Sequence, residues 1–526
     1  MITKKNNIFK NKRVLMLAPD IAIDRRILVE AETLIDEGYE VYLIAGGDEN
    51  QSEFEQDGRV RIERIKFNGV EHRLLMIYSI HGKVIQKINS NSLRFNNFCS
   101  KLSGKGTNFI MITRNKVISA INKFSLFGQK IFGKLSVLSR KSRVVNKIMW
   151  IALKLFLKCI EMTGKLSNKS LLLLTKIYQF IILLIVKGHN FIVTSFAKLI
   201  NIIVNYTIKI STRLFTLTAY EDRFYQRALF YRPDIIHVHD LPMLKIGVKI
   251  KEKLNIPLVY DMHEFYPEQP RLSQKQQSFL RRTEKKYVNS ADRVIMVNFM
   301  LGDVVKERYN LKSIDIVQNA IKNESEYIPG ERYDRFREDY PQLKDKFLLL
   351  YQGWIAPERN LENAIKAMSY VKSDKWVLLI MGYGDYAEDL KALAKEMNVE
   401  NKVVFVPAKP QSTLLTYSAS ADIGLIPYPT NKDLNTHYVS PNKLYEFIEA
   451  GLPILTNQLP YVKHVVEQNS FGLVADMDNP QSFAEAIDKI DIIRLIDFKK
   501  NLKENGYKYS WENEKCSLIN LYEQIN

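Results

Sequence analysis

The chain has 526 residues, 46% of them hydrophobic, so it is large enough for two or three domains and is not an intrinsically disordered protein. Its three cysteines, Cys99, Cys159 and Cys516, lie far apart without a CxxC pair, so we expect neither a disulfide framework nor a zinc site. This usage fits a reducing cytoplasm. The net charge of +18 is uneven: residues 74–220 hold 23 lysines and arginines against one acid, a net charge of +22, and the remainder carries −4.

Strands and helices alternate before this basic segment. The pattern predicts a strand over Arg13–Ala18, a helix over Asp24–Gly38 with apolar residues at helical spacing, and a strand over Tyr39–Gly47. Residues 1–73 are therefore expected to form the first part of an α/β domain.

The basic segment, residues 74–220, is predicted to be a helical insertion. Nine lysines from Lys147 to Lys209 recur at steps of 4, 7 and 11 residues, each close to a whole number of helical turns, so they form one stripe. No charge-free run exceeds ten residues, too few to span a bilayer readily. Cations between apolar runs favour an anionic membrane surface as partner and argue against nucleic acid. A membrane-spanning hairpin and a helical arm for protein binding are the alternatives.

The alternation resumes after the insertion. Strands are predicted over residues 234–240, 257–264 and 293–298 with helices between them, so residues 221–318 complete the first domain. A second series runs from Lys346 to Thr456 and places a second domain at residues 319–505. Apolar, β-branched strands that alternate with helices form covered parallel sheets, so the fold class is α/β, with two Rossmann-like domains facing across a cleft.

The second domain contains the strongest signals for ligand binding. No GxGxxG follows the first strand and no P-loop pattern occurs, which disfavours dinucleotide redox chemistry and P-loop phosphate transfer. Gly353, Gly382 and Gly384 end two predicted strands, where glycine permits close approach to a phosphate or base, although simple strand-to-helix turns explain them equally well.

The most specific stretch is SPNKLYEFIEAGLPIL, residues 440–455. Pro441 suits a first helical turn, and the amides of a helix starting near Asn442 favour anionic oxygens. Lys443 adds a cation to that turn, and Glu446 can accept hydrogen bonds from a ribose diol. Arg359 can supply a second cation. These residues predict a nucleotide site; an ordinary capped helix with solvated charges is the alternative.

Several stretches resemble the retaining family 4 glycosyltransferases, which have the GT-B fold. RVLMLAPDIAIDRR is similar to the family's opening strand and DxR turn, PDIIHVHD and VYDMHEFYPE to its acceptor-side motifs, and YQGWIAPERNLENAIKA to its phosphate-binding segment. SPNKLYEFIEAGLPI is similar to its EX7E region. The ending, residues 506–526, resembles a last helix that crosses back to the first domain. The resemblance covers residues 12–68 and 225–526.

The resemblance implies a metal-independent glycosyltransferase of the hexosyltransferase type, without a cofactor. Its partners would be a nucleotide-sugar donor and a lipid-linked or polysaccharide acceptor. The implied donor-binding residues are Gly353, Arg359, Gly382, Gly384, Ser440, Pro441, Asn442, Lys443 and Glu446. The implied acceptor-side residues are Asp24, Arg26, Asp240, His263 and Glu264. The expected catalytic residues are His263, Arg359, Lys443 and Glu446.

Two positions depart from the family pattern. Trp354 stands where the family has arginine after the phosphate-loop glycine, so Arg359, which matches the family lysine, would carry more of the diphosphate charge. Tyr438 stands in place of the first glutamate of EX7E. The one DxD string, Asp476 to Asp478, is predicted to be a loop and helix cap rather than a metal site.

Breaking a sugar–phosphate bond leaves an anionic nucleoside diphosphate, so stabilisation of this leaving group by Arg359, Lys443 and helix amides is the expected source of catalysis. We assign no protein nucleophile. The insertion lies in the acceptor domain, where it would hold the enzyme peripherally at the inner face of the cell membrane. A sugar-nucleotide epimerase of the same fold and a non-catalytic membrane scaffold subunit are the alternative functions.

Overall fold

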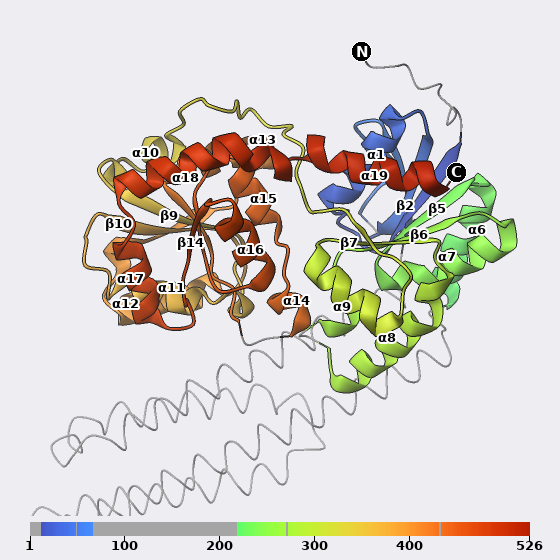
Figure 1. The fold of residues 1–526 in the computed structure, drawn as a ribbon, viewed down its shortest axis with the longest axis horizontal. Helices are drawn as coiled ribbons and strands as arrows, with labels where there is room; N and C mark the ends of the chain where they lie inside the picture. Colours follow the sequence, from blue (N-terminus) through green and yellow to red (C-terminus); the bar gives the residue numbers. More distant parts are fainter. Residues whose placement is uncertain (1–11, 49, 67–217, 270–271, 431–432, 526) are drawn as a thin grey trace, which may run out of the picture. The chain divides into compact units, whose positions relative to one another are not determined.

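The computed structural model describes residues 12–48, 50–66, 218–269, 272–430 and 433–525 (Figure 1). These residues belong to one compact unit, Met1–Phe67 with Leu217–Asn526. A second unit, Asn68–Thr216, lies outside the described residues, and with it nearly all of the insertion expected at residues 74–220. Within the described ranges, no helix combines the length and apolar content needed to cross a membrane.

The first domain is built on an eight-stranded sheet with the order β3-β4-β2-β1-β5-β6-β7-β8. All neighbouring strands are parallel except β3 and β4, which form a hairpin. The strands are β1 (Arg13–Ala18), β2 (Glu40–Gly47), β3 (Phe54–Asp57), β4 (Val60–Lys66), β5 (Ile235–His239), β6 (Leu258–Met262), β7 (Arg293–Met296) and β8 (Asp315–Ile316). The helices are α1 (Arg25–Asp36), α6 (Thr218–Tyr231), α7 (Asp240–Leu254), α8 (Gln274–Tyr287) and α9 (Phe299–Tyr309).

Helix α6 begins within the segment that the sequence assigned to the insertion. Its Tyr220 is buried, and the Tyr220 hydroxyl donates to the backbone oxygen of Pro19. The first domain therefore resumes at Thr218, three residues before the expected boundary.

The second domain contains a six-stranded, wholly parallel sheet with the order β11-β10-β9-β12-β13-β14. Its strands are β9 (Phe347–Trp354), β10 (Trp376–Tyr383), β11 (Val403–Pro407), β12 (Ile423–Ile426), β13 (Ile454–Thr456) and β14 (Gly472–Val474). Its helices are α10 (Arg335–Asp339), α11 (Leu361–Met368), α12 (Ala387–Glu396), α13 (Gln411–Ala419), α14 (Leu434–His437), α15 (Asn442–Glu449), α16 (Pro460–Gln468), α17 (Pro480–Asp488) and α18 (Ile492–Asn505).

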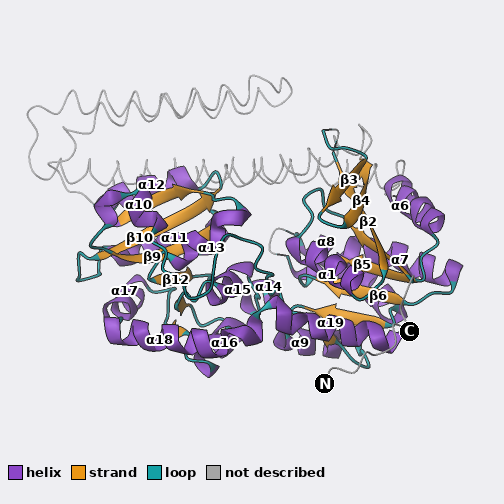
Figure 2. Cartoon of the chain, turned by 90° about the horizontal axis from the view of Figure 1, so that it is seen from above, coloured by secondary structure: helices purple, strands orange, loops and turns teal. Residues whose placement is uncertain are grey.

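Both sheets are doubly wound, with helices on both faces (Figure 2). Central strands such as β5 and β6 are buried along their whole length because helices cover them on both sides. The strand order reverses between β1 and β5 in the first sheet and between β9 and β12 in the second. Ligands of such sheets bind at the carboxyl ends of the strands beside these reversals, which directs attention to two edges.

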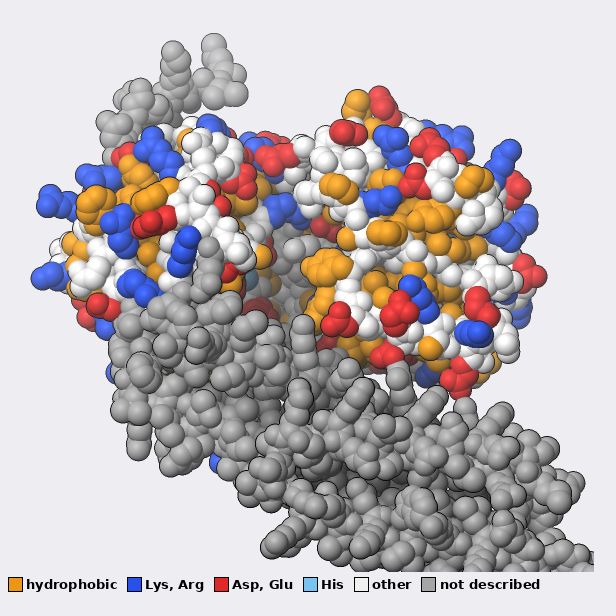
Figure 3. Space-filling view, turned by 180° about the vertical axis from the view of Figure 1, so that it is seen from behind, with side chains coloured by type: hydrophobic (Ala, Val, Ile, Leu, Met, Phe, Trp, Pro, Cys, Tyr) orange, Lys and Arg blue, Asp and Glu red, His pale blue; other side chains and the backbone are white. Residues whose placement is uncertain are grey.

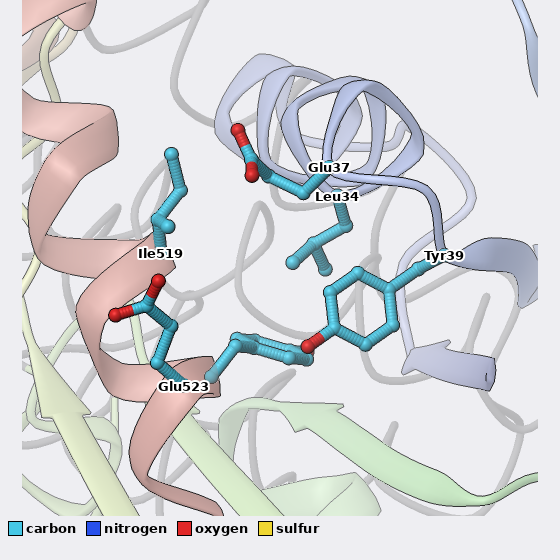
Figure 4. A pocket seen from close by; sticks show the side chains of 6 residues that line it. Leu34, Glu37, Tyr39, Ile519 and Glu523 are labelled. Atoms are coloured by element: carbon cyan, nitrogen blue, oxygen red, sulfur yellow. The ribbon is translucent and has the colours of Figure 1, made fainter. Parts of the chain in front are cut away.

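The last helix, α19 (Trp511–Ile525), packs against α1 of the first domain. The Nε1 atom of Trp511 donates a hydrogen bond of 2.9 Å to Thr33 Oγ1 on α1, and both residues are buried. The rings of Tyr522 and Tyr39 meet edge to face, with centroids 5.5 Å apart. Figure 4 shows the small pocket that remains between α19 and the corner from α1 to β2.

Replacing Thr33 by valine tests this attachment. Thr33→Val keeps the shape of the side chain but leaves the buried Trp511 N–H without an acceptor, so we expect a loss of about 1–3 kcal/mol in the free energy of unfolding. Thr416→Val is the matched control, because the Thr416 hydroxyl is also buried but bonds only a carbonyl of its own helix. Urea unfolding measures the free energy of unfolding of both variants. Equal losses in Thr33→Val and Thr416→Val would contradict the role given to the Trp511 hydrogen bond.

Candidate functional site

Two cations lie at the carboxyl ends of β9 and β12, where the strand order of the second sheet reverses. The Nζ atom of Lys443, in the first turn of α15, is 3.9 Å from the ring centroid of Tyr351 and 4.9 Å from that of Tyr428. The Cζ atom of Arg359 is 4.5 Å from the Tyr428 centroid and 5.5 Å from that of Trp354. Neither cation forms an ion pair with a carboxylate among the described residues, and Arg359 Nε is buried without a hydrogen-bond partner there.

The pKa shifts around this pair reflect its concentrated positive charge. Burial lowers the pKa of Lys443, and the neighbouring Arg359 lowers it further, although Tyr428 opposes both effects. Burial alone would raise the pKa of Tyr428, but Lys443 and Arg359 together lower it. Two cations that lie over aromatic rings and form no ion pair with a described carboxylate make a site suited to an anion such as a diphosphate.

Glu446 lies one helical turn beyond Lys443, and its two oxygens are held separately. Gln352 Nε2 donates to Oε2 at 2.6 Å, and Arg25 Nη2 of the first domain donates to Oε1 at 3.3 Å. The carboxylate is therefore fixed in orientation and remains slightly exposed, with 11% of its side chain accessible. The sequence singled out Glu446 but not Arg25, because pairing across 421 positions of the chain leaves no local pattern.

The remaining expected donor-binding residues divide into two groups. Gly382 and Gly384 are required by strand packing, since a Cβ atom there would lie 1.8 Å from Gly353 O and 2.1 Å from Ile355 O. Strand packing alone therefore explains why glycine stands at these two positions. Gly353 instead borders the cations, because a Cβ atom there would come within 3.7 Å of Lys443 Nζ. At the start of α15, Pro441 is the N-cap without a side-chain hydrogen bond and Asn442 is exposed, so no side chain caps the first turn of the helix.

The Ser440 side chain and the DxD string make hydrogen bonds to other groups of the protein. Ser440 Oγ hydrogen bonds with the Tyr445 hydroxyl at 2.8 Å, so this side chain supports the start of α15. In the DxD string, Asp478 accepts from Thr430 and Asn457, while the side chain of Asn479 caps α17. The loop was predicted correctly, but the cap is Asn479 and not an aspartate.

A buried network of charges and histidines lies at the edge of the first sheet, where β5 and β6 end. His263 Nε2 is 3.1 Å from Asp261 Oδ2 and 3.0 Å from His239 Nδ1. The guanidinium of Arg26 donates to Asp261 Oδ1 and, at 2.7 Å, to Glu30 Oε1. Among these side chains, His263 is the most exposed, with 12% of its side chain in contact with solvent. The network therefore presents an imidazole at the surface of the site.

Burial alone would lower the pKa of His263, but the charge of Asp261 raises it to about 9. Burial lowers the pKa of His239 to about 4, so this ring is neutral. Burial also raises the pKa of Glu30 to about 7, and Asp261 adds to the effect. At neutral pH the network therefore holds an imidazolium at His263 beside a neutral imidazole at His239.

Asp240 starts α7 directly after β5 and has a backbone φ of 60°, in the left-handed region. Its Oδ1 accepts from the backbone amide of His263 at 3.1 Å. Burial raises the pKa of Asp240 to about 7, with further contributions from the carboxylates of Glu264 and Asp20, although His263 lowers it. A half-buried carboxyl that titrates near neutrality beside an imidazolium can exchange a proton with a bound hydroxyl group.

Of the expected acceptor-side residues, Asp240, His263 and Glu264 lie together at this edge, and Gln269 donates to Glu264. Asp24 and Arg26 have other roles. The Asp24 side chain caps α1 by accepting from the Arg26 amide, and Arg26 is 4% exposed with its guanidinium engaged by protein groups. The guanidinium of Arg26 is held by buried carboxylates, as a buried cation requires. Arg26 and Asp24 therefore stabilise the structure around the site and do not contact an acceptor.

The four side chains of Glu30, His237, His239 and Asp261 also have the spacing of metal ligands, with atoms within 4.8 Å of one another. Arg26, however, already binds both carboxylates. A guanidinium thus fills the cation position of the cluster, and a metal ion would meet its positive charge at short range.

Comparison with known proteins agrees with this geometry. Residues 333–509 match the family model of glycosyl transferases group 1, and residues 196–325 match that of glycosyltransferase family 4. An uncharacterized glycosyltransferase of Methanocaldococcus jannaschii is 25% identical over 305 residues, 55% of this chain and 75% of that protein. Alpha-monoglucosyldiacylglycerol synthase of Streptococcus pneumoniae is 24% identical over 300 residues, 54% of this chain and 64% of that protein.

Solved structures share the fold. Sucrose-phosphate synthase from Thermosynechococcus elongatus matches with a TM-score of 0.59 and 14% identity, over 98% of this chain and 99% of that one. Anabaena HepE, solved with UDP and glucose, matches with a TM-score of 0.55 and 11% identity, over 98% and 100% of the two chains. The chain belongs to the group 1 glycosyltransferases and has the GT-B fold, which confirms the family expected from its motifs.

The raised pKa of Asp240 predicts a pH-dependent loss of stability. A carboxyl whose folded pKa is raised contributes stability that is present below its unfolded pKa, near 4, and lost as the pH rises through about 7. Asp240→Asn removes this loss, and asparagine tolerates the left-handed backbone. We expect the variant to gain stability relative to wild type by on the order of 1–2 kcal/mol between these pH values, after allowance for partial solvation.

Urea unfolding across this pH range measures the difference between the two proteins. Asp303→Asn, at an exposed aspartate of α9, is the control. A stability difference between Asp240→Asn and wild type that stays constant with pH would refute the raised pKa.

Proposed function

We propose that the chain is a retaining glycosyltransferase that moves a sugar from a nucleoside-diphosphate sugar to a lipid-linked or polysaccharide acceptor at the inner face of the membrane. The observation that carries the proposal is the pair of cations, Arg359 and Lys443, that no described carboxylate neutralises. A diphosphate supplies the missing negative charge. Ligands named for similar structures support a nucleotide donor: one was solved with UDP and glucose, another with UDP-2-fluoro glucose.

The donor would lie along the ends of β9, β12 and α15. Its diphosphate faces Arg359, Lys443 and the first amides of α15, which stabilise the charge that develops on the leaving group. Glu446, already oriented by Gln352, is positioned for the ribose hydroxyls. Trp354 is 49% exposed beside Arg359 and replaces the arginine expected from the family pattern, so it offers a ring surface in place of a charge. No metal ion is needed for this arrangement, and metal independence stays a prediction.

The acceptor would meet the donor beside Asp240 and His263. In this proposal the Asp240 carboxylate takes the proton of the attacking hydroxyl group of the acceptor. The His263 imidazolium forms a hydrogen bond with the nucleotide sugar. The acceptor class is supported by relatives, whose names include a glucosyldiacylglycerol synthase and an O-antigen chain mannosyltransferase. Membrane attachment through residues 74–220 belongs to the same proposal and rests on their sequence pattern.

Binding of nucleoside diphosphates tests the donor site. Arg359→Met and Lys443→Met each remove a charge-assisted contact, so titration calorimetry with UDP, GDP and ADP should show about ten- to hundred-fold weaker binding of the preferred nucleotide. Lys409→Met is the control, because Lys409 also lies over a tyrosine ring, 4.1 Å from the Tyr417 centroid, but its charge is paired with Asp339. Unchanged affinity in both site variants would refute the proposal.

Turnover extends this test. Wild type, Arg359→Ala and Glu446→Ala are compared with a panel of UDP-, GDP- and ADP-sugars, with and without anionic liposomes that contain extracted lipid acceptor. We expect release of a nucleoside diphosphate that both variants lose and that the liposomes stimulate. Absence of turnover and nucleotide binding in wild type would contradict the proposed reaction.

The two pKa values at the acceptor side predict a bell-shaped pH profile. Asp240 must be ionised, so kcat/KM should rise through about pH 7, and His263 must be protonated, so it should fall through about pH 9. His263→Gln keeps a hydrogen-bond donor without a titratable ring. In this variant we expect the alkaline fall to disappear while the acid limb remains. A profile in which the alkaline limb survives this substitution would remove His263 from the reaction.

A further inference from the structure

Helix α8 presents an outward face of unusual composition. The exposed residues Lys275, Phe279, Arg282, Lys285 and Lys286 fall within an arc of about 120° around the helix axis. Phe279 is 62% exposed in the midst of the four cations. The opposite face holds Glu284, which is fully buried and bonds the hydroxyls of Tyr260 and Tyr309 at 2.7 and 2.5 Å. The helix is thus fixed in rotation, and its cationic face points away from the domain.

The contacts of the four cations within the described protein are confined to α8: Arg282 donates to the backbone oxygen of Ser278, and Lys286 lies over the ring of Tyr287. None of them forms an ion pair with a described carboxylate, whereas Arg281, at the edge of the face, pairs with Glu268 at 2.7 Å. The outward arc of α8 carries no acid at all. On the side of the molecule in Figure 3, the two signs of charge are interspersed over the described surface. A single-sign face around one exposed aromatic ring therefore calls for an anionic partner.

We propose that this face of α8 docks on the anionic phospholipid surface of a membrane. Long cationic side chains reach the phosphate groups, and the ring of Phe279 enters the boundary between headgroups and acyl chains. This inference rests on the proposed transfer to a lipid-linked acceptor, and it adds a membrane contact within the folded domain that is separate from residues 74–220.

The position of α8 relates the docking face to the acceptor side of the site. The helix begins ten residues after Glu264, and Gln269 between them donates to Glu264. Glu268 of the same short segment holds Arg281 and Arg308, so the segment is fixed to both α8 and α9. In the chain, only this short segment separates His263 from α8. A lipid surface bound by α8 would therefore lie on the side of the domain that carries His263.

A dye attached at residue 279 tests the contact directly. Phe279→Cys is labelled with an environment-sensitive fluorophore in the full chain, with the native cysteines replaced by serine, and mixed with phosphatidylcholine vesicles with or without phosphatidylglycerol. We expect emission to rise only with phosphatidylglycerol and to be quenched by spin-labelled acyl chains. The same dye at Tyr370→Cys, 47% exposed in the second domain, should not respond. No response at residue 279 while the protein sediments with the vesicles would overturn the proposal.

A matched pair of charge reversals separates location from net charge. Arg282→Glu with Lys286→Glu should lower vesicle partitioning at least about ten-fold, because four units of charge change at the contact. Lys499→Glu with Lys503→Glu on α18 has the same spacing, exposure and charge change, and should lower it much less. Equal losses in the two doubles would overturn the proposal, as would an α8 double that loses binding to a soluble polyanion but not to vesicles.

Nucleotide binding distinguishes the two proposals. The α8 double should bind the nucleoside diphosphate as wild type does, since α8 contributes nothing to the donor site. Intact nucleotide binding with unchanged vesicle partitioning would refute the docking face and leave the transferase proposal standing. Loss of nucleotide binding in Arg359→Met and Lys443→Met is measured independently of lipid.

Discussion

The guanidinium of Arg26 is buried and binds one side chain of its own helix and two from distant parts of the chain. It donates to Glu30 on α1, to Asp261 at the end of β6, and at 3.1 Å to Asn319 Oδ1, in the segment that leads into the second domain. Asn319 Nδ2 in turn donates to the backbone oxygen of Ser440 at 2.8 Å, immediately before α15. One side chain thus connects the carboxylate beside His263 with the start of α15, the helix whose amides would face the donor in the proposed function. Its removal would leave the buried carboxylate of Glu30 without its cation, which folded proteins rarely tolerate, and would leave Asp261 with His239 and His263 as partners.

The two sides of the site differ in how their charge is balanced. In the first domain, Asp261 is paired with Arg26 and His263, and burial sets the protonation states of His239 and Asp240. In the second domain, Arg359 and Lys443 lie over aromatic rings and form no ion pair with a described carboxylate. In the proposed function, the side with paired charges would exchange a proton, and the side whose cations form no ion pair with a described carboxylate would bind the anion. An enzyme that must hold a leaving diphosphate and activate a hydroxyl group requires both.

Much of the fold could be predicted from local patterns, and the misses are instructive. The apolar runs at β1, β5, β9 and β10 were recognised because burial on both faces leaves a continuous hydrophobic signal. The hairpin of β3 and β4 was missed, although Asp57-Gly58 marks a tight turn and Gly58 adopts a φ of 54°. The early start of α6 was also missed, because apolar residues of the insertion run into the helix without a break. Local periodicity identifies elements better than it identifies their ends.

The sequence by itself determined the family and the two α/β domains and singled out Arg359, Lys443 and Glu446 as candidates, because strand periodicity, helix-start chemistry and short motifs are all local properties. Only the tertiary structure decided that Arg26 is a buried support while its neighbour Arg25 contacts Glu446, since adjacent helix residues point in directions about 100° apart and their partners lie hundreds of positions away. It likewise decided that Gly382 and Gly384 serve strand packing. Protonation at Asp240 and His263 depends on burial and on charges brought together by folding, and these are absent from the linear chain.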